Sequence, residues 1–225
     1  MERQQFPGTY RDVQGEEHIQ WQLQPVTGTH GYDTFDVCFS VRGVEVRGAD
    51  LDSVEAVDRR AAEAAGLTMC PDSEDIVGCV LAGVLPVTVQ VDGRRDRADI
   101  SFVIDLRDGG GHWPLRVSLE LQETVYEVVE QSFEDGLRRL EAALPPGVTL
   151  VSCHTCRWST FQPYSWSVLG MRCHRDAREQ ALAAHGRHAI AAVPVTEWIP
   201  ATYLCSQYER QDATGAQPAS GGHDG

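Results

Sequence analysis

The sequence predicts an α+β fold that is mainly antiparallel β sheet, with one long amphipathic helix and a cysteine-rich C-terminal subdomain. Three observations support this prediction. Several stretches alternate apolar and polar residues, which is typical of strands buried on one face. One stretch repeats its apolar residues every three to four positions, as an amphipathic helix does. Four of the seven cysteines lie in the last third of the chain.

The alternating stretches follow one another with turn residues between them. The in-phase segments are 18–24, 34–42, 98–105 and 114–122. Asp92-Gly93 and the run Gly109–Gly111 lie between predicted strands and are typical of hairpin turns. The longest apolar run, 76–91, contains two glycines and a proline and is interpreted as a pair of strands. Because short turns join successive strands, we expect an antiparallel sheet.

The long helix is predicted over residues 124–144. Its apolar face consists of Val125, Val128, Val129, Phe133, Leu137, Leu140 and Leu144. Thr124 and Glu127 have the spacing of a capping box, and Pro145-Pro146-Gly147 should end the helix. Two less regular stretches, 52–66 and 176–188, are also interpreted as helices.

The length of 225 residues suits one or two domains. We expect a β-rich domain over residues 1–147, which ends in the long helix, and a subdomain over residues 148–210 packed on it. Residues 211–225 are mostly small or polar, and the prediction there is a disordered tail.

The charge balance excludes some classes of partner. The chain has 19 basic and 33 acidic residues, a net charge of −14 with neutral histidines. Nucleic acids and anionic membranes attract positively charged surfaces, so binding to either is not expected. The sequence shows neither a signal peptide nor an apolar stretch long enough for a membrane helix. We therefore expect a cytoplasmic protein with reduced thiols.

The C-terminal cysteines have the spacing of a metal site. Cys153 and Cys156 form a C-x-x-C pair, Cys173 follows after sixteen residues, and Cys205 after thirty-one more. A C-x-x-C knuckle directs two thiolates at one ion, and two further thiolates complete the tetrahedron that Zn²⁺ prefers. The prediction is a zinc-knuckle-like subdomain with Zn²⁺ as cofactor and these four cysteines as ligands. Four protein thiolates leave no open coordination position, which favours a structural role over catalysis.

Other interpretations stay open at this level. Cys173 and Cys205 could be ordinary buried cysteines, and the C-x-x-C pair could be a redox dithiol. His154 and His174 could each replace a thiolate, but each adjoins a cysteine and is better placed beside the site or at the surface. The remaining cysteines are predicted to be core residues. These are Cys38, Cys70 and Cys79.

The loop after the knuckle is rich in aromatic side chains, and no catalytic motif accompanies it. Residues 157–166 contain Trp158, Phe161, Tyr164 and Trp166. These side chains could fill a small core or form a binding surface. Phosphate-binding glycine loops, zinc-protease motifs and nucleophile elbows are absent from the sequence. Carboxylates that could pair as acid and base are Asp12 with Glu16 and Glu17, and Asp105 with Asp108.

Several segments resemble an uncharacterised actinobacterial family known only as a domain of unknown function. The matching segments are 6–12, 42–50, 144–147, 153–156, 163–164, 173–176 and 203–210. The resemblance implies the same order of four cysteines and therefore supports the metal site. The chain departs from the family at Tyr164-Ser165-Trp166, where the family has Tyr-Gly, and at His174, where it has an aromatic residue. The resemblance implies an architecture and no activity.

We therefore expect a non-catalytic cytosolic module that has a structural four-cysteine zinc site and binds a protein partner or a small molecule. The alternative is an accessory enzyme of bacterial secondary metabolism that uses the zinc as a scaffold. The closed set of thiolates and the absence of a catalytic motif favour the first function.

Overall fold

The computed structural model describes residues 4–26, 34–107, 113–161 and 169–211, and a ten-stranded sheet dominates it. The strands of this sheet are β1 (Gln4–Asp12), β2 (Gly15–Val26), β3 (Thr34–Val41), β4 (Val44–Asp50), β5 (Ser53–Ala56), β8 (Val80–Val91), β9 (Arg94–Asp105), β10 (Leu115–Leu121), β11 (Thr124–Glu130) and β12 (Val148–Leu150). All of their pairings are antiparallel. The prediction of a mainly antiparallel sheet is confirmed.

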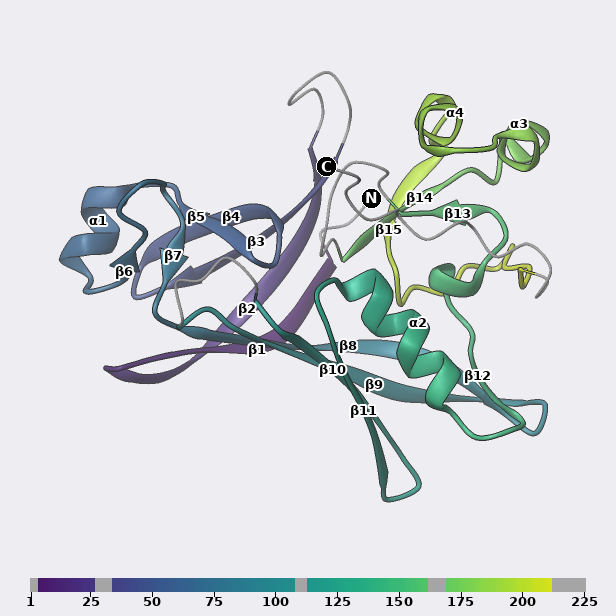
Figure 1. Ribbon diagram of the computed structural model, residues 1–225, viewed down its shortest axis with the longest axis horizontal. Coiled ribbons are helices and arrows are strands. Elements are labelled where there is room, and N and C mark those ends of the chain that lie inside the picture. The colour runs from purple at the N-terminus through teal and green to yellow at the C-terminus, as the bar shows by residue number, and fades with distance from the viewer. Residues whose placement is uncertain (1–3, 27–33, 108–112, 162–168, 212–225) are drawn as a thin grey trace, which may run out of the picture.

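The order of the strands is β11-β10-β9-β8-β1-β2-β3-β4-β5, with β12 paired to one end of β8. The sheet curls into a half-barrel. Figure 1 shows helix α2 (Phe133–Ala143) lying across β10 and β11, with the C-terminal segments beside it. The predicted turn at Asp92-Gly93 joins β8 to β9, and both of its residues have the positive φ of a type I′ turn.

One hydrophobic core runs through the described residues. Trp21 is fully buried at its centre, with ring centroids 4.7 Å from Phe39 and 5.6 Å from Phe102. Phe102 in turn packs edge-on against Phe133 of α2, at 6.1 Å. The same cluster includes Leu169, Met171, Cys173, Trp198 and Ile199 from the C-terminal segments. The C-terminal part of the chain therefore shares its core with the large sheet.

The helix predicted over 124–144 is wrong in its first third. Residues 124–130 form β11 and pair with β10. Helix α2 begins only after Ser132, whose Oγ accepts a hydrogen bond from the N–H of Asp135 at 3.1 Å. The valines of this stretch are β-branched and favour a strand, and β10 supplies the backbone partners that a strand needs.

The two other predicted helices are shorter than expected. In their place the structure has α1 (Arg59–Ala64), α3 (Arg178–Ala183) and α4 (Arg187–Ala192). Residues 52–66 begin with β5, and the N-cap of α1 is Asp58, whose side chain accepts a hydrogen bond from the N–H of Ala61. Residues 176–188 are divided at Gly186, whose φ of 85° ends any continuous helix.

The apolar run 76–91 contains two strands, as predicted, but they do not pair with each other. The short β7 (Ile76–Val77) pairs with β6 (Thr68–Met69), and the long β8 pairs with β9, β1 and β12. Further along the chain, β13 (Ser159–Thr160), β14 (Gly170–Cys173) and β15 (Glu197–Pro200) form a second, three-stranded sheet. Strand β15 ends at Pro200, five residues before Cys205.

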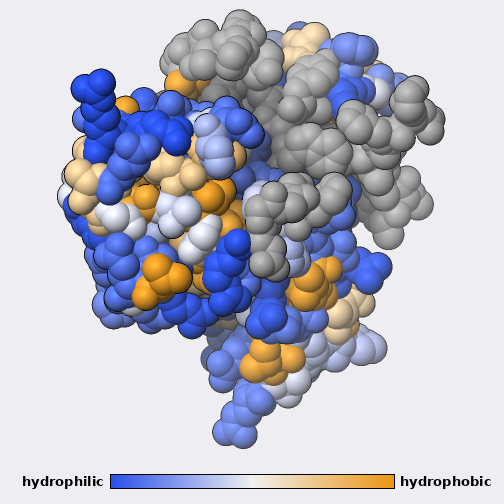
Figure 2. Space-filling model, turned by 60° about the vertical axis from the view of Figure 1, so that its left-hand side comes forward, coloured by the Kyte–Doolittle hydropathy of each residue, from blue (hydrophilic) through white to orange (hydrophobic). Residues whose placement is uncertain are grey.

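The surface is mixed in character. Figure 2 shows one face on which hydrophobic residues form separate islands among hydrophilic ones. Within the described ranges no helix has the length and apolar character to cross a membrane. The predicted turn at Gly109–Gly111 and the predicted tail beyond Gln211 lie outside the described residues.

A candidate metal centre between the two sheets

The C-x-x-C pair lies in a tight turn directly after β12. Residues Cys153–Thr155 form the 3-10 helix η2, and the N–H of Cys156 donates to the carbonyl oxygen of Cys153 at 3.1 Å. The Thr155 hydroxyl donates to the carbonyl oxygen of Leu150 at 3.0 Å and lies 2.9 Å from the Tyr208 hydroxyl. These bonds fix the turn between β12 and the last described segment. Both cysteines of the pair are buried.

Backbone hydrogen bonds bring the other two predicted ligands to this turn. The N–H of Cys153 donates to the carbonyl oxygen of Tyr203 at 2.7 Å, and Tyr203 precedes Cys205 by two residues. Cys173 ends β14 and pairs with Ser159, which follows the knuckle by three residues. Three segments that are far apart in the sequence therefore meet at the four cysteines.

The thiols are close enough to affect one another's ionisation. Burial raises the pKa of Cys153, and Cys156, Cys205 and Cys173 raise it further because their negative charges oppose its own. Burial also raises the pKa of Cys173, with Cys205 and Cys156 adding to the effect. As the side chains stand, however, the described residues contain no group of three or more Cys, His, Asp or Glu side chains positioned to hold a metal ion.

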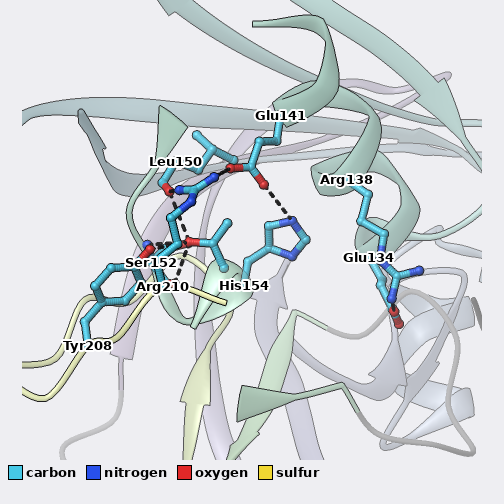
Figure 3. A network of polar contacts seen from close by, with 9 residues as sticks. Glu134, Arg138, Glu141, Leu150, Ser152, His154, Tyr208 and Arg210 are labelled. Carbon is cyan, nitrogen blue, oxygen red and sulfur yellow. Dashed lines mark hydrogen bonds and ion pairs between the residues drawn. The ribbon is translucent and has the colours of Figure 1, made fainter. Parts of the chain in front are cut away.

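His154 is expected beside the metal site or at the surface, and its buried side chain excludes the surface position. Its side chain is 5 % exposed, and Nε2 lies 4.0 Å from Oε2 of Glu141 on α2. Figure 3 shows the ring facing this carboxylate. Burial, together with the charges of Arg138 and Arg210, lowers the pKa of His154 to about 3, and the ring is therefore neutral. Its Nδ1 is buried and has no hydrogen-bond partner within the described residues.

His174 is fully buried and uses both ring nitrogens. Nδ1 lies 2.8 Å from the carbonyl oxygen of Pro194, and Nε2 lies 2.9 Å from Oγ1 of Thr160. A ring with two such partners has no free nitrogen for a metal. Of the two histidines considered as alternative ligands, His154 alone keeps a nitrogen without a described partner.

Arg210 ties the last described segment to α2 and β12. Its Nη2 donates to Oε1 of Glu141 at 2.7 Å, and its Nη1 donates to the carbonyl oxygen of Leu150 at 3.1 Å, as Figure 3 shows. Glu141 therefore faces both Arg210 and the His154 ring. The network joins α2, β12 and the last described segment, and it includes His154, which follows Cys153. We call the place where the segments of Cys153, Cys156, Cys173 and Cys205 meet the cysteine junction.

The aromatic loop contributes at least one side chain to the core rather than to a surface. Trp158 is 6 % exposed. The guanidinium carbons of Arg157 and Arg178 each lie 4.8 Å from the centroid of its ring, a cation–π arrangement. Glu209 forms an ion pair with each of these arginines. Tyr164 and Trp166 lie outside the described residues.

Among the candidates for acid–base chemistry, Asp12, Glu17 and Asp105 are held in ion pairs with arginines. Asp12 accepts two hydrogen bonds from the guanidinium of Arg42, at 2.8 and 2.9 Å, and Arg42 Nε donates to Glu17 at 2.7 Å. Arg42 thereby holds the pKa of Asp12 below its usual value. Sequence reasoning missed Arg42 because it lies 30 residues from Asp12. Asp105 is bound by Arg107 in the same way, and Asp108 is outside the described residues.

Of the three cysteines predicted to be core residues, Cys38 and Cys79 are buried, whereas Cys70 is not. Cys70 is half-buried, and the Ser73 hydroxyl, followed by the backbone of Asp72, lowers its pKa by hydrogen bonding. It therefore forms a thiolate more readily than an ordinary cysteine.

Cys70 is expected to be alkylated at least ~10-fold faster than Cys79 at pH 7.5, because exposure and thiolate content together set cysteine reactivity. Cys79 is the internal control, since it is fully buried and its pKa is raised to about 12. A time course with iodoacetamide, followed by peptide mass spectrometry, measures both rates in one sample. Equal rates for the two thiols would contradict this assignment.

Comparison with known proteins gives one match. Residues 4–159 match a family described as a family of unknown function (DUF6304). The match includes Cys153 and Cys156 and ends before Cys173 and Cys205. The resemblance to a family of unknown function is thus confirmed, whereas its actinobacterial origin and the shared order of four cysteines stay predictions. Neither the curated proteins nor the solved structures contain a significant match.

Proposed function

Since the chain belongs to the DUF6304 family, which has no assigned function, we propose its function from its own cysteine junction. The protein acts as a non-catalytic cytoplasmic binding module, in which Cys153, Cys156, Cys173 and Cys205 bind a structural Zn²⁺. The zinc ion fixes the C-terminal segments against the large sheet. The ligand is a small molecule or a partner protein.

The convergence of the four cysteines is the observation that carries this proposal. The Cys153 N–H···O Tyr203 bond and the pairing of Ser159 with Cys173 bring all three cysteine segments to one junction. Zinc requires four sulfurs at about 2.3 Å from one ion, so the cysteine side chains must turn inward when it binds. The pKa values of the buried thiols are raised, and a bound cation reverses that effect because it stabilises the thiolates.

The donor set supports a structural role for the ion. Four thiolates fill the tetrahedral shell, which leaves no position for water or substrate. His154 approaches the junction as a neutral ring and interacts with Glu141, which is typical of a residue that supports a site rather than reacts. The carboxylates Asp12 and Asp105 are occupied by arginines. These observations favour a zinc ion that cross-links the cysteine segments and takes no part in a reaction.

Protein purified under reducing conditions is expected to contain about one zinc per chain by elemental analysis. Cys153→Ser or Cys205→Ser should reduce this value to below ~0.2, because removing a thiolate opens the site. The loss should be accompanied by faster proteolysis after Arg157 and Arg178, since the segments held by the ion are released. Both variants are compared with the wild type in the same preparation.

Cys79→Ser is the matched control, because Cys79 is as buried as Cys153 and lies directly before β8 rather than at the junction. It should retain one zinc even if it loses stability. Wild-type protein that is folded and free of zinc after purification in zinc-containing medium would reject the metal centre. An unchanged zinc content in both junction variants would reject these ligands.

A further inference from the structure

Strand β8 has a gap in its pairing on one side. It pairs with β9 along its whole length, but on the other side β1 pairs with residues 80–83 and β12 with residues 89–91. The carbonyl oxygen of Thr88 accepts the N–H of Val151 at 2.8 Å, so it faces this side. Because the direction alternates along a strand, the backbone of Pro86 faces the gap as well. Proline has no N–H, which explains why it is tolerated in the middle of this long strand.

A cavity of about 220 Å³ lies in this gap. Its walls include Phe6 of β1, residues 85–88 of β8, Arg97 of β9 and residues 202–204. Successive residues of a strand point to opposite faces, so contact with four consecutive residues places the cavity beside the edge of β8. The wall at 202–204 immediately precedes Cys205 and is attached to the knuckle through the N–H of Cys153. The proposed zinc site therefore supports one wall of the cavity.

The cavity combines exposed apolar side chains with one cation. Arg97 pairs with Thr88 in the sheet, so its side chain shares a face of β8 with Thr88 and Pro86, whereas Leu85 and Val87 point to the buried face. Pro86 and Tyr203 are the exposed apolar residues of the lining. Arg97 is the one charged residue among the described residues that line it. Its guanidinium makes no hydrogen bond or ion pair within the described part of the chain, whereas that of Arg42 is held by two carboxylates. In a chain of net charge −14, an arginine that lines a cavity and has no carboxylate partner among the described residues favours an anionic ligand.

We propose that this cavity binds a small organic carboxylate with a ring or a branched apolar body. The carboxylate pairs with Arg97, whose planar guanidinium suits bidentate binding, and the apolar body packs on Pro86 and Tyr203. A cavity of about 150 Å³ holds benzene, so the larger volume here admits a ring with a carboxylate. The proposal names the ligand class of the binding function proposed above and rests on it.

An added peptide strand suits the gap less well than a small molecule. Strand addition depends on a continuous row of backbone donors and acceptors. At Pro86 the row lacks its donor, and on either side the gap is closed by β1 and β12. The volume is also below the roughly 300 Å³ at which pockets for drug-sized ligands begin, which limits the ligand to about one ring.

Titration of the full-length protein with phenylacetate, followed by calorimetry and by amide chemical shifts, tests this proposal. Phenylacetate should bind with a Kd of about 1 mM or lower. Phenylacetamide, which has the same shape and no charge, should bind ~10-fold more weakly. Arg97→Gln should weaken phenylacetate binding by ~10-fold and remove the preference for the acid, and Arg97→Lys should retain part of it. Arg60→Gln, an exposed arginine on α1 far from the cavity lining, should bind like the wild type.

Three outcomes would overturn the proposal. These are the absence of phenylacetate binding up to ~10 mM, equal affinity for acid and amide, and equal affinity of the wild type and Arg97→Gln. Zinc is measured in the same samples, so the two proposals fail separately. Zinc-free protein that binds phenylacetate through Arg97 rejects only the metal centre. Zinc-loaded protein without an Arg97-dependent signal rejects only the carboxylate site.

Discussion

Arg42→Ala is expected to lower the free energy of unfolding by about 3 kcal/mol at pH 7, because it leaves the carboxylate of Asp12 buried without its partner. The Asp12 side chain is 3 % exposed, and of the four groups that donate hydrogen bonds to it the two from Arg42 are the charged ones, while the Gln14 N–H and the Tyr10 hydroxyl are neutral. Arg42 also donates to Glu17 and thereby joins two neighbouring hairpins. Alanine meets the same backbone strain as arginine at the positive φ of this turn, so the difference reports the side chain. Urea unfolding of both proteins measures it.

Arg47→Ala is the control for this substitution. Arg47 pairs with Glu45, but the two side chains are 49 % and 57 % exposed, and its loss should cost less than ~0.5 kcal/mol. A similar cost for both variants would show that the Arg42 cluster is no stronger than a surface pair.

The effect of Arg42→Ala should depend on pH. Arg42 lowers the folded-state pKa of Asp12, so the stability contributed by the pair is present above the unfolded pKa of about 3.9 and is lost as the pH falls through the lower folded value. In the variant, burial without Arg42 favours the protonated acid. The difference between the two proteins should therefore be largest at neutral pH and shrink below about pH 4. A difference that is constant from pH 7 to pH 3 would contradict this assignment.

Gly8→Ala is expected to destabilise the protein by about 4 kcal/mol. A Cβ at this position would overlap the carbonyl oxygen of Ala82 and the indole of Trp21. The Trp21 Nε1–H donates to that same oxygen at 2.8 Å, so the added methyl group displaces a buried ring and breaks its hydrogen bond. Overpacking costs about 1–3 kcal/mol and a buried donor without a partner a similar amount. Thermal and urea unfolding measure the loss.

A double-mutant cycle with Trp21→Phe separates this cause from a general effect on β1. Phenylalanine lacks the indole nitrogen that opposes the new methyl group, so Gly8→Ala should cost at least ~1 kcal/mol less in the Trp21→Phe background. Simple additivity of the two substitutions would rule out the conflict with the indole.

Local alternation in the sequence predicted the large sheet well. The segments 18–24, 34–42, 98–105 and 114–122 lie in strands, apart from at most one residue at each end. Burial on one face imposes a period of two, which can be recognised without knowing the partner strand. The same approach failed at 124–130. A valine-rich stretch fits both periods over so short a length, and only pairing with β10 decides between strand and helix.

Part of the candidate site could be predicted from the sequence. Spacing identified the four cysteines, and the structure brings their segments together. The spacing of residues in the sequence could not reveal that His154 faces Glu141. Nor could it reveal that Arg210, 69 residues further along the chain, binds the same carboxylate. Contacts of this kind depend on how α2 docks on the sheet, which local patterns do not encode.

The amino-acid sequence by itself determined the antiparallel sheet and the net charge of −14, and the spacing of its cysteines predicted the candidate zinc site. Only the tertiary structure decided that β1 and β12 pair with separate parts of the same edge of β8 and leave a gap between them. It also placed Pro86 in this gap and Arg97 in the lining of the cavity there. The physical reason is that periodicity and spacing reflect whether each residue is buried or exposed. A cavity and the charge beside it depend instead on how segments far apart in the sequence are arranged in space.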